Sequence, residues 1–141
     1  MAAPSLIVVD DEPDMAALIG HVAEELGFSV RVAQNGEQFQ RLWDEEKPAA
    51  AVLDIVMPDM DGNELLDWLI QQGGAIPVVL VSGFGGRYLE LAHRLGSERG
   101  ATITANLTKP IRIGDLRDAL RGVLSHLGHT EPGESAQGTS A

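Results

Sequence analysis

The chain has 141 residues, which suffices for one ordinary domain with a substantial hydrophobic core and leaves no room for a second folded domain. It contains no cysteine, which excludes disulfide bonds, a thiolate nucleophile and a zinc–thiolate site. The formal net charge of −11, from 21 acidic residues against 10 Lys plus Arg, disfavours direct binding to nucleic acid and to anionic membrane surfaces.

The N-terminal segment MAAPSLIVVDDEPD shows no targeting or membrane signal. It carries no basic leader, and its apolar run covers only residues 5–9, whereas a membrane span needs roughly 18 apolar residues. We therefore expect a cytoplasmic protein with no membrane segment.

Short apolar runs bounded by turn residues predict the strands. The continuous runs at 5–9, 49–53 and 76–81 are typical of strands covered on both faces, as in a parallel sheet. Two weaker candidates are the alternating segment at 28–33 and the segment at 102–107.

Apolar residues at helical spacing separate these strands. One helix face is predicted to carry Met15, Leu18, Ile19, Val22 and Leu26. Similar groups occur within 39–43, 65–70, 88–95 and 116–127. The alternation predicts an α/β fold in which five βα units form a doubly wound, five-stranded parallel sheet.

The C-terminal segment differs from the rest of the chain. Residues 128–141, GHTEPGESAQGTSA, are mostly small and polar and show no apolar periodicity, so they cannot offset the entropy of ordering. We expect one folded domain over residues 1–127 and a disordered tail over 128–141. A linker to a further domain is the alternative for this tail.

Polar residues end the apolar runs, and these are candidates for a functional site. They are Asp10 and Asp11 after the first strand, Asp54 after the third, Ser82 after the fourth and Lys109 after the fifth. Ligands of open α/β sheets bind beyond the carboxyl ends of the strands, so we expect these side chains to converge there.

Asp10 and Asp11 are predicted to form half of a magnesium site. Adjacent carboxylates repel and raise each other's pKa unless a cation holds them together, and oxygen ligands suit Mg²⁺. The alternative is that the acids of DDEPD only cap the following helix, whose N-terminus favours acids and tolerates proline. Asp54 at a neighbouring strand end favours the metal site.

Asp54 is the candidate nucleophile. A carboxylate beside Mg²⁺ can attack phosphorus, because the metal offsets the charge that builds on the phosphoryl oxygens. Lys109 would add a second positive charge and Ser82 a hydrogen bond. Alone, this lysine is more simply a solvated surface residue and this serine a turn residue; their shared position at strand ends favours the functional interpretation.

The sequence resembles the receiver domains of two-component response regulators over about residues 5–127. The resemblance rests on VVDDEP after the first strand, VLDIVMPDMDG around the third, LVSG ending the fourth and TKP after the fifth. Pro58 and Gly62 match the loop after the acceptor. The resemblance implies a flavodoxin-like strand order of 2-1-3-4-5.

The resemblance also implies the site chemistry. Asp54 would accept a phosphoryl group from a histidine kinase or a histidine phosphotransfer protein. Mg²⁺ would be bound by Asp11, Asp54 and the main-chain carbonyl of Val56, with Asp10 acting through water. Ser82 and Lys109 would take the roles argued above, and the peptide bond before Pro110 would be cis.

One position departs from the family pattern. Receivers of this kind usually carry Tyr or Phe three residues before the lysine, as a switch aromatic, whereas this chain has Asn106. The usual coupling between the serine and that aromatic is therefore in doubt. Phe84 is the nearest aromatic after Ser82, although an edge-packing role suits it better.

Val56 and Phe84 stand two residues after the acceptor and two after the hydroxyl, where a hydrolytic water would be admitted. Neither side chain can hydrogen-bond to water, so we expect a long-lived phosphorylated state.

We therefore interpret the chain as a stand-alone receiver. It would assist its own phosphorylation and dephosphorylation without being an enzyme in the usual sense. It would signal through an altered surface, formed by the fourth helix, fifth strand and last helix, or pass its phosphoryl group onward. Its partners would be the kinase or phosphotransfer protein and a downstream protein, and a homodimer is an open alternative.

Three rival functions fit less well. Aspartyl phosphohydrolases of the haloacid dehalogenase type carry, by resemblance, a second acid two residues after the nucleophile, where this chain has Val56. A flavodoxin-like cofactor binder needs hydrogen-bond donors after the first strand, where this chain has DDEPD. A degenerate scaffold receiver would not need the intact acids, hydroxyl and lysine.

Overall fold

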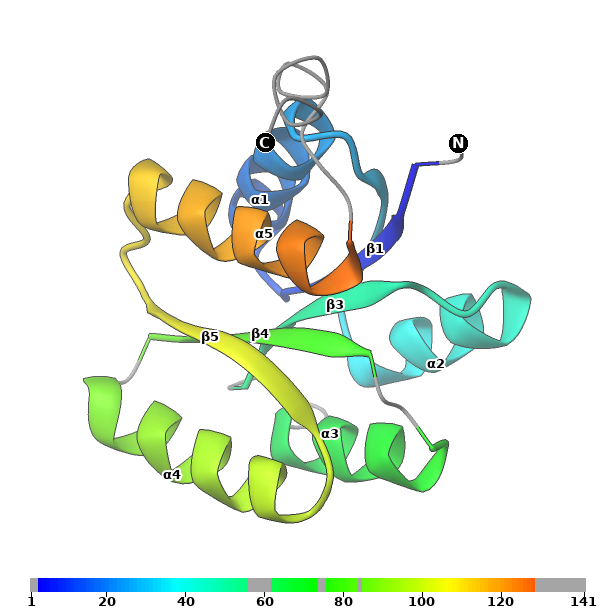
Figure 1. Ribbon diagram of the computed structural model, residues 1–141, viewed down its shortest axis with the longest axis vertical. Helices are drawn as coiled ribbons and strands as arrows, with labels where there is room; N and C mark the ends of the chain where they lie inside the picture. Colours follow the sequence, from blue (N-terminus) through cyan, green and yellow to red (C-terminus); the bar gives the residue numbers. More distant parts are fainter. Residues whose placement is uncertain (1–2, 56–61, 74–75, 84, 129–141) are drawn as a thin grey trace.

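The computed structural model describes residues 3–55, 62–73, 76–83 and 85–128 (Figure 1). Five parallel strands lie in the order β2-β1-β3-β4-β5, which confirms the predicted α/β fold and its flavodoxin-like sheet. The strands are β1 (Ser5–Val9), β2 (Ser29–Ala33), β3 (Ala50–Asp54), β4 (Pro77–Ser82) and β5 (Thr102–Thr108). The helices are α1 (Pro13–Glu25), α2 (Gly36–Glu45), α3 (Gly62–Gln71), α4 (Gly85–Glu98) and α5 (Ile113–Leu127).

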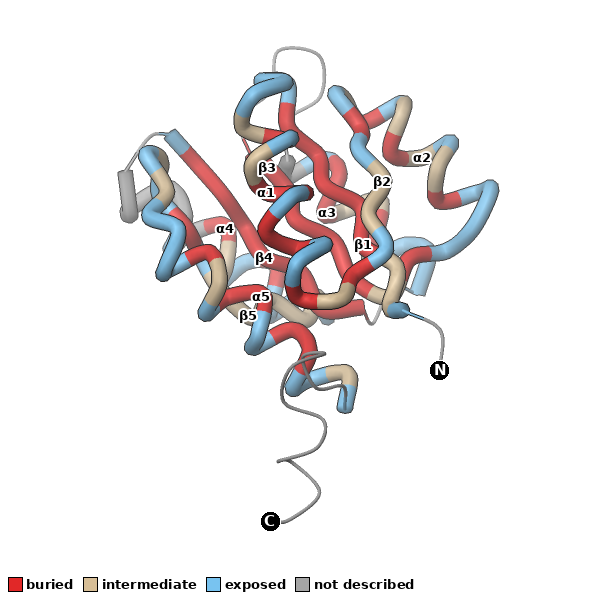
Figure 2. The backbone as a smooth tube through the Cα atoms, turned by 90° about the horizontal axis from the view of Figure 1, so that it is seen from above, coloured by how far each residue is buried: buried red, intermediate tan, exposed pale blue. Residues whose placement is uncertain are grey.

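Two hydrophobic cores hold the helices against the sheet. Alternate residues of each central strand point to opposite faces, so that Leu6 and Val8 join one core while Ile7 and Val9 join the other. The first core packs under α1 and α5, and the second under α2, α3 and α4 (Figure 1). The central strands are buried almost throughout (Figure 2), as their continuous apolar runs predict.

None of the helices in the described ranges is both long and apolar enough to cross a lipid bilayer.

A β-bulge in the edge strand β5 changes the direction of its side chains. Val78 of β4 pairs with Ile103, but Val79 pairs with Ala105, so Thr104 is an extra residue. Ile103 consequently packs into the core under α3 and α4, whereas Ala105 packs into the core under α1 and α5. The shift also lets Asn106 meet α4, where its Oδ1 lies 3.1 Å from Nδ1 of His93.

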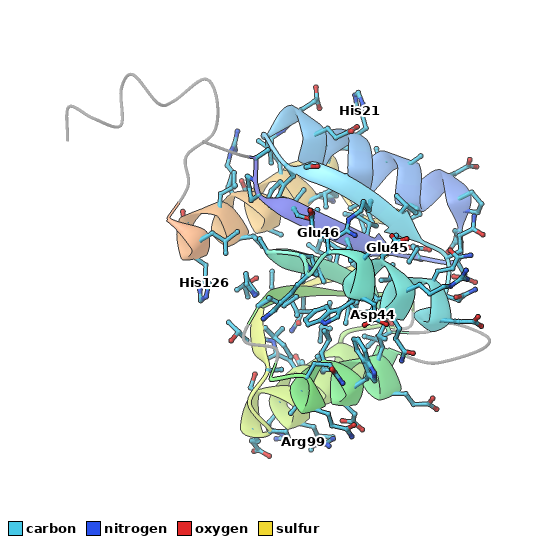
Figure 3. The ribbon with its side chains drawn as sticks, turned by 90° about the vertical axis from the view of Figure 1, so that its right-hand side faces the viewer. His21, Asp44, Glu45, Glu46, Arg99 and His126 are labelled. Carbon is cyan, nitrogen blue, oxygen red and sulfur yellow. The ribbon has the colours of Figure 1, made fainter. Side chains whose placement is uncertain are left out.

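Helix α4 packs unusually closely on its neighbours at Gly96. A Cβ atom added at Gly96 would lie 2.6 Å from a methyl carbon of Leu66 and 2.9 Å from one of Ile103. Just beyond α4, Arg99 (Figure 3) pairs with Asp67 of α3. A small residue at position 96 therefore sets how near α4 lies to α3 and β5.

We predict that Gly96→Ala lowers stability by about 1–3 kcal/mol relative to Gly122→Ala, because the new methyl group overpacks a filled interface. Gly122→Ala is the matched control, since it lies on an exposed face of α5 and an added Cβ would meet nothing within 4 Å. That change should raise stability by about 0.5–1 kcal/mol through helix propensity alone. Chemical denaturation followed by circular dichroism measures both, and equal effects would contradict the close-packing argument.

Candidate functional site

Strand register brings the site residues to one level of the sheet. Val9 pairs with Leu53, so the next residues, Asp10 and Asp54, lie side by side at the carboxyl ends of β1 and β3. On the far side of β3, Asp54 itself pairs with Val81 of β4. The last residue of β4, Ser82, pairs with Thr108 of β5, and Lys109 follows directly.

Backbone hydrogen bonds continue the parallel ladders past the strand ends and fix this edge. The Asp10 N–H donates to the Ala33 carbonyl at 3.1 Å, and the Lys109 N–H donates to the Ser82 carbonyl at 2.8 Å. The peptide bond between Lys109 and Pro110 is cis. The main chain that carries the lysine is therefore tied to the end of β4.

The Lys109 ammonium is shared among three carboxylates. It donates to Glu12 Oε1 at 2.8 Å, to Asp54 Oδ2 at 3.1 Å and to Asp10 Oδ1 at 3.4 Å. The Lys109 side chain is 13% exposed, those of Asp10 and Asp54 are 1% and 3% exposed, and that of Glu12 is 61% exposed. One cation thus joins two buried acids and one surface acid.

Burial raises the pKa of Asp10 above its ordinary value of 3.8. Desolvation is the largest cause, and the charge of Asp54 acts in the same direction. The hydrogen bonds from the Glu12 N–H, at 2.9 Å, and from Lys109 oppose it without cancelling it. Asp10 is therefore a carboxylate whose ionised form is under electrostatic stress.

The pKa of Lys109 is raised although burial of its ammonium would lower it. The hydrogen bonds to Glu12, Asp10 and Asp54 outweigh the desolvation. Lys109 consequently stays protonated throughout the physiological range, as a group that balances charge on oxygen must.

The site is suited to a hard divalent cation. Carboxylate oxygens of Asp10, Asp11 and Glu12 lie within 4.8 Å of one another. Asp10 Oδ2 is buried and receives no hydrogen bond from the described residues, although the Lys109 ammonium lies 3.1 Å away. A buried anionic oxygen that is compensated only by the ion pair with Lys109 is a fitting ligand for Mg²⁺ or for its bound water.

The structure brings together most of the residues predicted from the sequence. Asp10, Asp54 and Ser82 are buried at the carboxyl edge, and Asp11 is exposed beside them. The positions of Val56, Pro58 and Phe84 lie outside the described residues, as does the tail after Gly128.

Glu12 is the site residue that the sequence interpretation did not single out. Its backbone occupies the N-cap of α1, but its side chain makes no capping hydrogen bond and lies against Lys109 instead. The available signal was its place as the third acid in DDE, next to a predicted pair. Sequence alone gives no reason to join it to a lysine 97 residues away.

A groove of about 520 Å³ lies between β5 and α5, on the side of the edge strand away from α4. Small residues such as Ala105, Ala119 and Gly122 line it together with Arg112 and Asp115. It borders Lys109 through Thr108, so the groove adjoins the carboxyl edge of the sheet.

Comparisons with known proteins agree with this geometry. A family model described as the response regulator receiver domain matches residues 6–121. The alkaline phosphatase synthesis transcriptional regulatory protein PhoP of Bacillus subtilis is 30% identical over 119 residues, which are 84% of this chain and 48% of that protein. The chain spans about half the length of this relative and of the Mycobacterium tuberculosis relatives TcrX and TrcR.

Solved structures with the same fold include two response regulators. The receiver domain of a Francisella response regulator has a TM-score of 0.74 and 27% identity, covering 88% of this chain and 98% of its own. A response regulator from Colwellia psychrerythraea has a TM-score of 0.76 and 26% identity, covering 89% of this chain and 99% of its own.

We predict that Asp10→Asn raises the melting temperature of the metal-free protein. The raised pKa means that Asp10 favours folding when protonated, below about pH 3.8, and that this contribution is lost as pH rises through the folded-state pKa. The asparagine removes that loss, can still accept the Glu12 N–H, and leaves Lys109 two carboxylate partners. We expect a gain of about 4 °C at neutral pH and a smaller one in acid.

Calorimetry of both proteins from acid to neutral pH checks this prediction. A melting temperature that is unchanged or lower in the variant at neutral pH would show that the carboxylates at this edge are not in electrostatic conflict.

Proposed function

This chain belongs to the response regulator receiver domain family, and we propose that it accepts a phosphoryl group on Asp54 and thereby acts as a switch. Receiver domains take the phosphoryl group from histidine kinases or phosphotransfer proteins and act on downstream effectors. The observation that carries the proposal is the convergence of a protonated lysine on a buried strand-end carboxylate, Lys109 Nζ lying 3.1 Å from Asp54 Oδ2.

The proposed reaction is a displacement at phosphorus. One Asp54 carboxylate oxygen forms the new P–O bond while the P–N bond of the donor phosphohistidine breaks, and its electron pair returns to the imidazole nitrogen. Lys109 balances charge on the phosphoryl oxygens, and the Ser82 hydroxyl donates a hydrogen bond to one of them. Both groups stand at strand ends next to Asp54.

Mg²⁺ is the proposed cofactor. Asp11, Asp54 and the main-chain carbonyl of Val56 would hold it, with Asp10 reaching it through water. The described residues support the parts of Asp10 and Asp11 in this assignment, since their carboxylate oxygens lie within 4.8 Å of each other and the buried Asp10 Oδ2 lacks a hydrogen bond among them. When bound, the ion supplies positive charge that lowers repulsion between the acceptor and the phosphoryl oxygens.

The proposed output surface comprises α4, β5 and α5. The contact between His93 and Asn106 links α4 to β5, and the groove lies between β5 and α5. Asn106 replaces the switch aromatic, so the coupling from Ser82 to this surface would not use a tyrosine or phenylalanine at that position. A change here would be recognised by a downstream protein or by a second copy of the chain.

The curated relatives that match this chain include transcriptional regulatory proteins. Our proposal therefore includes a cytoplasmic location and a histidine kinase or phosphotransfer protein as the phosphoryl donor. Onward transfer of the phosphoryl group from Asp54 to another protein is the alternative output.

Incubation with acetyl phosphate and Mg²⁺, followed by intact mass measurement, tests the acceptor. We expect the wild-type chain to gain the mass of one phosphoryl group and Asp54→Asn to gain none, because the amide is a poor nucleophile. Omission of Mg²⁺ should suppress the gain. Phosphorylation of Asp54→Asn to the wild-type extent would place the acceptor elsewhere.

The lifetime of the phosphorylated state remains a sequence-based prediction, since Val56 and Phe84 lie outside the described residues. We expect Val56→Asn combined with Phe84→Glu to shorten the lifetime several-fold, because polar side chains there can orient a hydrolytic water. Following phosphate loss after removal of the donor measures this. An unchanged lifetime in the double variant would refute the idea.

A further inference from the structure

The hydrogen-bonding capacity of Lys109 is fully used before any phosphoryl group arrives. An ammonium has three N–H donors, and here they meet Glu12, Asp54 and Asp10. For Lys109 to contact a phosphoryl oxygen while keeping Asp54 and Asp10, the contact with Glu12 has to be given up.

The three carboxylates that contact Lys109 differ greatly in the free energy that losing this contact would cost. Asp10 is 1% exposed and already has one oxygen without a hydrogen bond among the described residues, so losing Lys109 would leave a buried, poorly compensated charge. The Glu12 side chain is 61% exposed and becomes hydrated when released, at little cost. It is also the only one of the three Lys109 partners that is exposed to solvent.

Among the described residues, the Glu12 side chain has no hydrogen-bond partner other than Lys109, so no second contact holds it in place there. The N-cap of α1 is formed by its backbone, and its side chain makes no capping hydrogen bond. Its N–H is fixed by Asp10 Oδ1 at 2.9 Å, a contact that every side-chain variant retains. Repulsion between its carboxylate and an incoming phosphoryl group favours its departure.

We infer that Glu12 is an exchangeable positioning residue: it holds Lys109 in the unphosphorylated state and is replaced by a phosphoryl oxygen when Asp54 is phosphorylated. The inference rests on the proposed role of Asp54. Lys109 remains an ammonium and Glu12 a carboxylate throughout, so one charged hydrogen bond breaks as another forms. Glu12 thereby slows phosphorylation, because its contact has to break first.

Two substitutions of Glu12 distinguish the effect of its contact with Lys109 from the effect of its negative charge. Glu12→Ala removes both, whereas Glu12→Asp keeps the charge but is one methylene too short for the present contact and is suited to capping α1 instead. Asp14→Asn is the matched control, since it removes one negative charge from an exposed residue in the first turn of the same helix. Circular dichroism verifies that all variants fold.

The rate of phosphoryl gain from acetyl phosphate should rise about threefold in both Glu12 variants and stay unchanged in Asp14→Asn. The rates are compared at saturating Mg²⁺, since the Glu12 carboxylate also belongs to the acidic cluster with Asp10 and Asp11. Acceleration in Glu12→Ala but not in Glu12→Asp would assign the effect to charge repulsion and overturn the inference. A slower or unchanged rate in Glu12→Ala would also overturn it.

Nuclear magnetic resonance of the lysine ammonium groups observes the exchange itself. The only other lysine, Lys47, lies 5.6 Å from the ring centroid of Trp43 on α2 and serves as an internal reference. In ¹⁵N-lysine-labelled protein, the Lys109 signal should differ between wild type and Glu12→Asp. With Mg²⁺ and beryllium fluoride, which mimics a phosphoryl group on a carboxylate, the two signals should coincide.

A difference that persists with beryllium fluoride would show that Glu12 stays on Lys109 and would overturn the exchange. Failure of the proposed function has a different result: the wild-type chain would then gain no phosphoryl group from acetyl phosphate. A wild type that is phosphorylated, with Glu12 variants that behave identically to it, would refute the inference alone.

Discussion

The ion pairs of Lys109 are the interaction on which the site depends. Two buried carboxylates, Asp10 and Asp54, lie side by side because each directly follows one member of the paired residues Val9 and Leu53 of β1 and β3. Without a cation between them, their repulsion and desolvation would oppose folding of the strand ends. The lysine that supplies this cation is anchored through its own N–H to the end of β4. The positions of the two carboxylates and the lysine are therefore determined by the pairing of β1, β3 and β4.

Much of this arrangement could be predicted from the sequence, for a physical reason. In a parallel sheet all strands end at the same edge, so polar residues that follow apolar runs must meet there. This reasoning located Asp54, Ser82 and Lys109 from their positions alone, and the continuous apolar runs located the buried strands. The predicted ends of β3 and β4 were one residue short, since the polar residues Asp54 and Ser82 themselves belong to the strands.

Other features could not be predicted from the sequence because they depend on the direction of side chains. Glu12 follows the metal-site acids in a segment that is typical of a helix start, and the sequence cannot show that its side chain turns away from the helix. The contact between His93 and Asn106 likewise requires the spacing of α4 and β5, which depends on the absence of a Cβ at Gly96. Such contacts between distant segments become apparent only once the packing is known.

The extra residue at Thr104 has a consequence for how β5 tolerates change. Ile103 and Ala105 are two positions apart, yet they face opposite sides of the sheet because Thr104 is the extra residue. The alternation of side chains along Thr102–Thr108 is therefore interrupted at the bulge. Deleting Thr104 would make Ile103 and Ala105 direct neighbours that still face opposite cores, so the strand would become regular without moving either residue from its core. Deleting a residue from Ala105 to Leu107 would instead move the residues beyond it to the opposite face of the sheet. The bulge position should therefore tolerate a deletion that the following half of β5 does not.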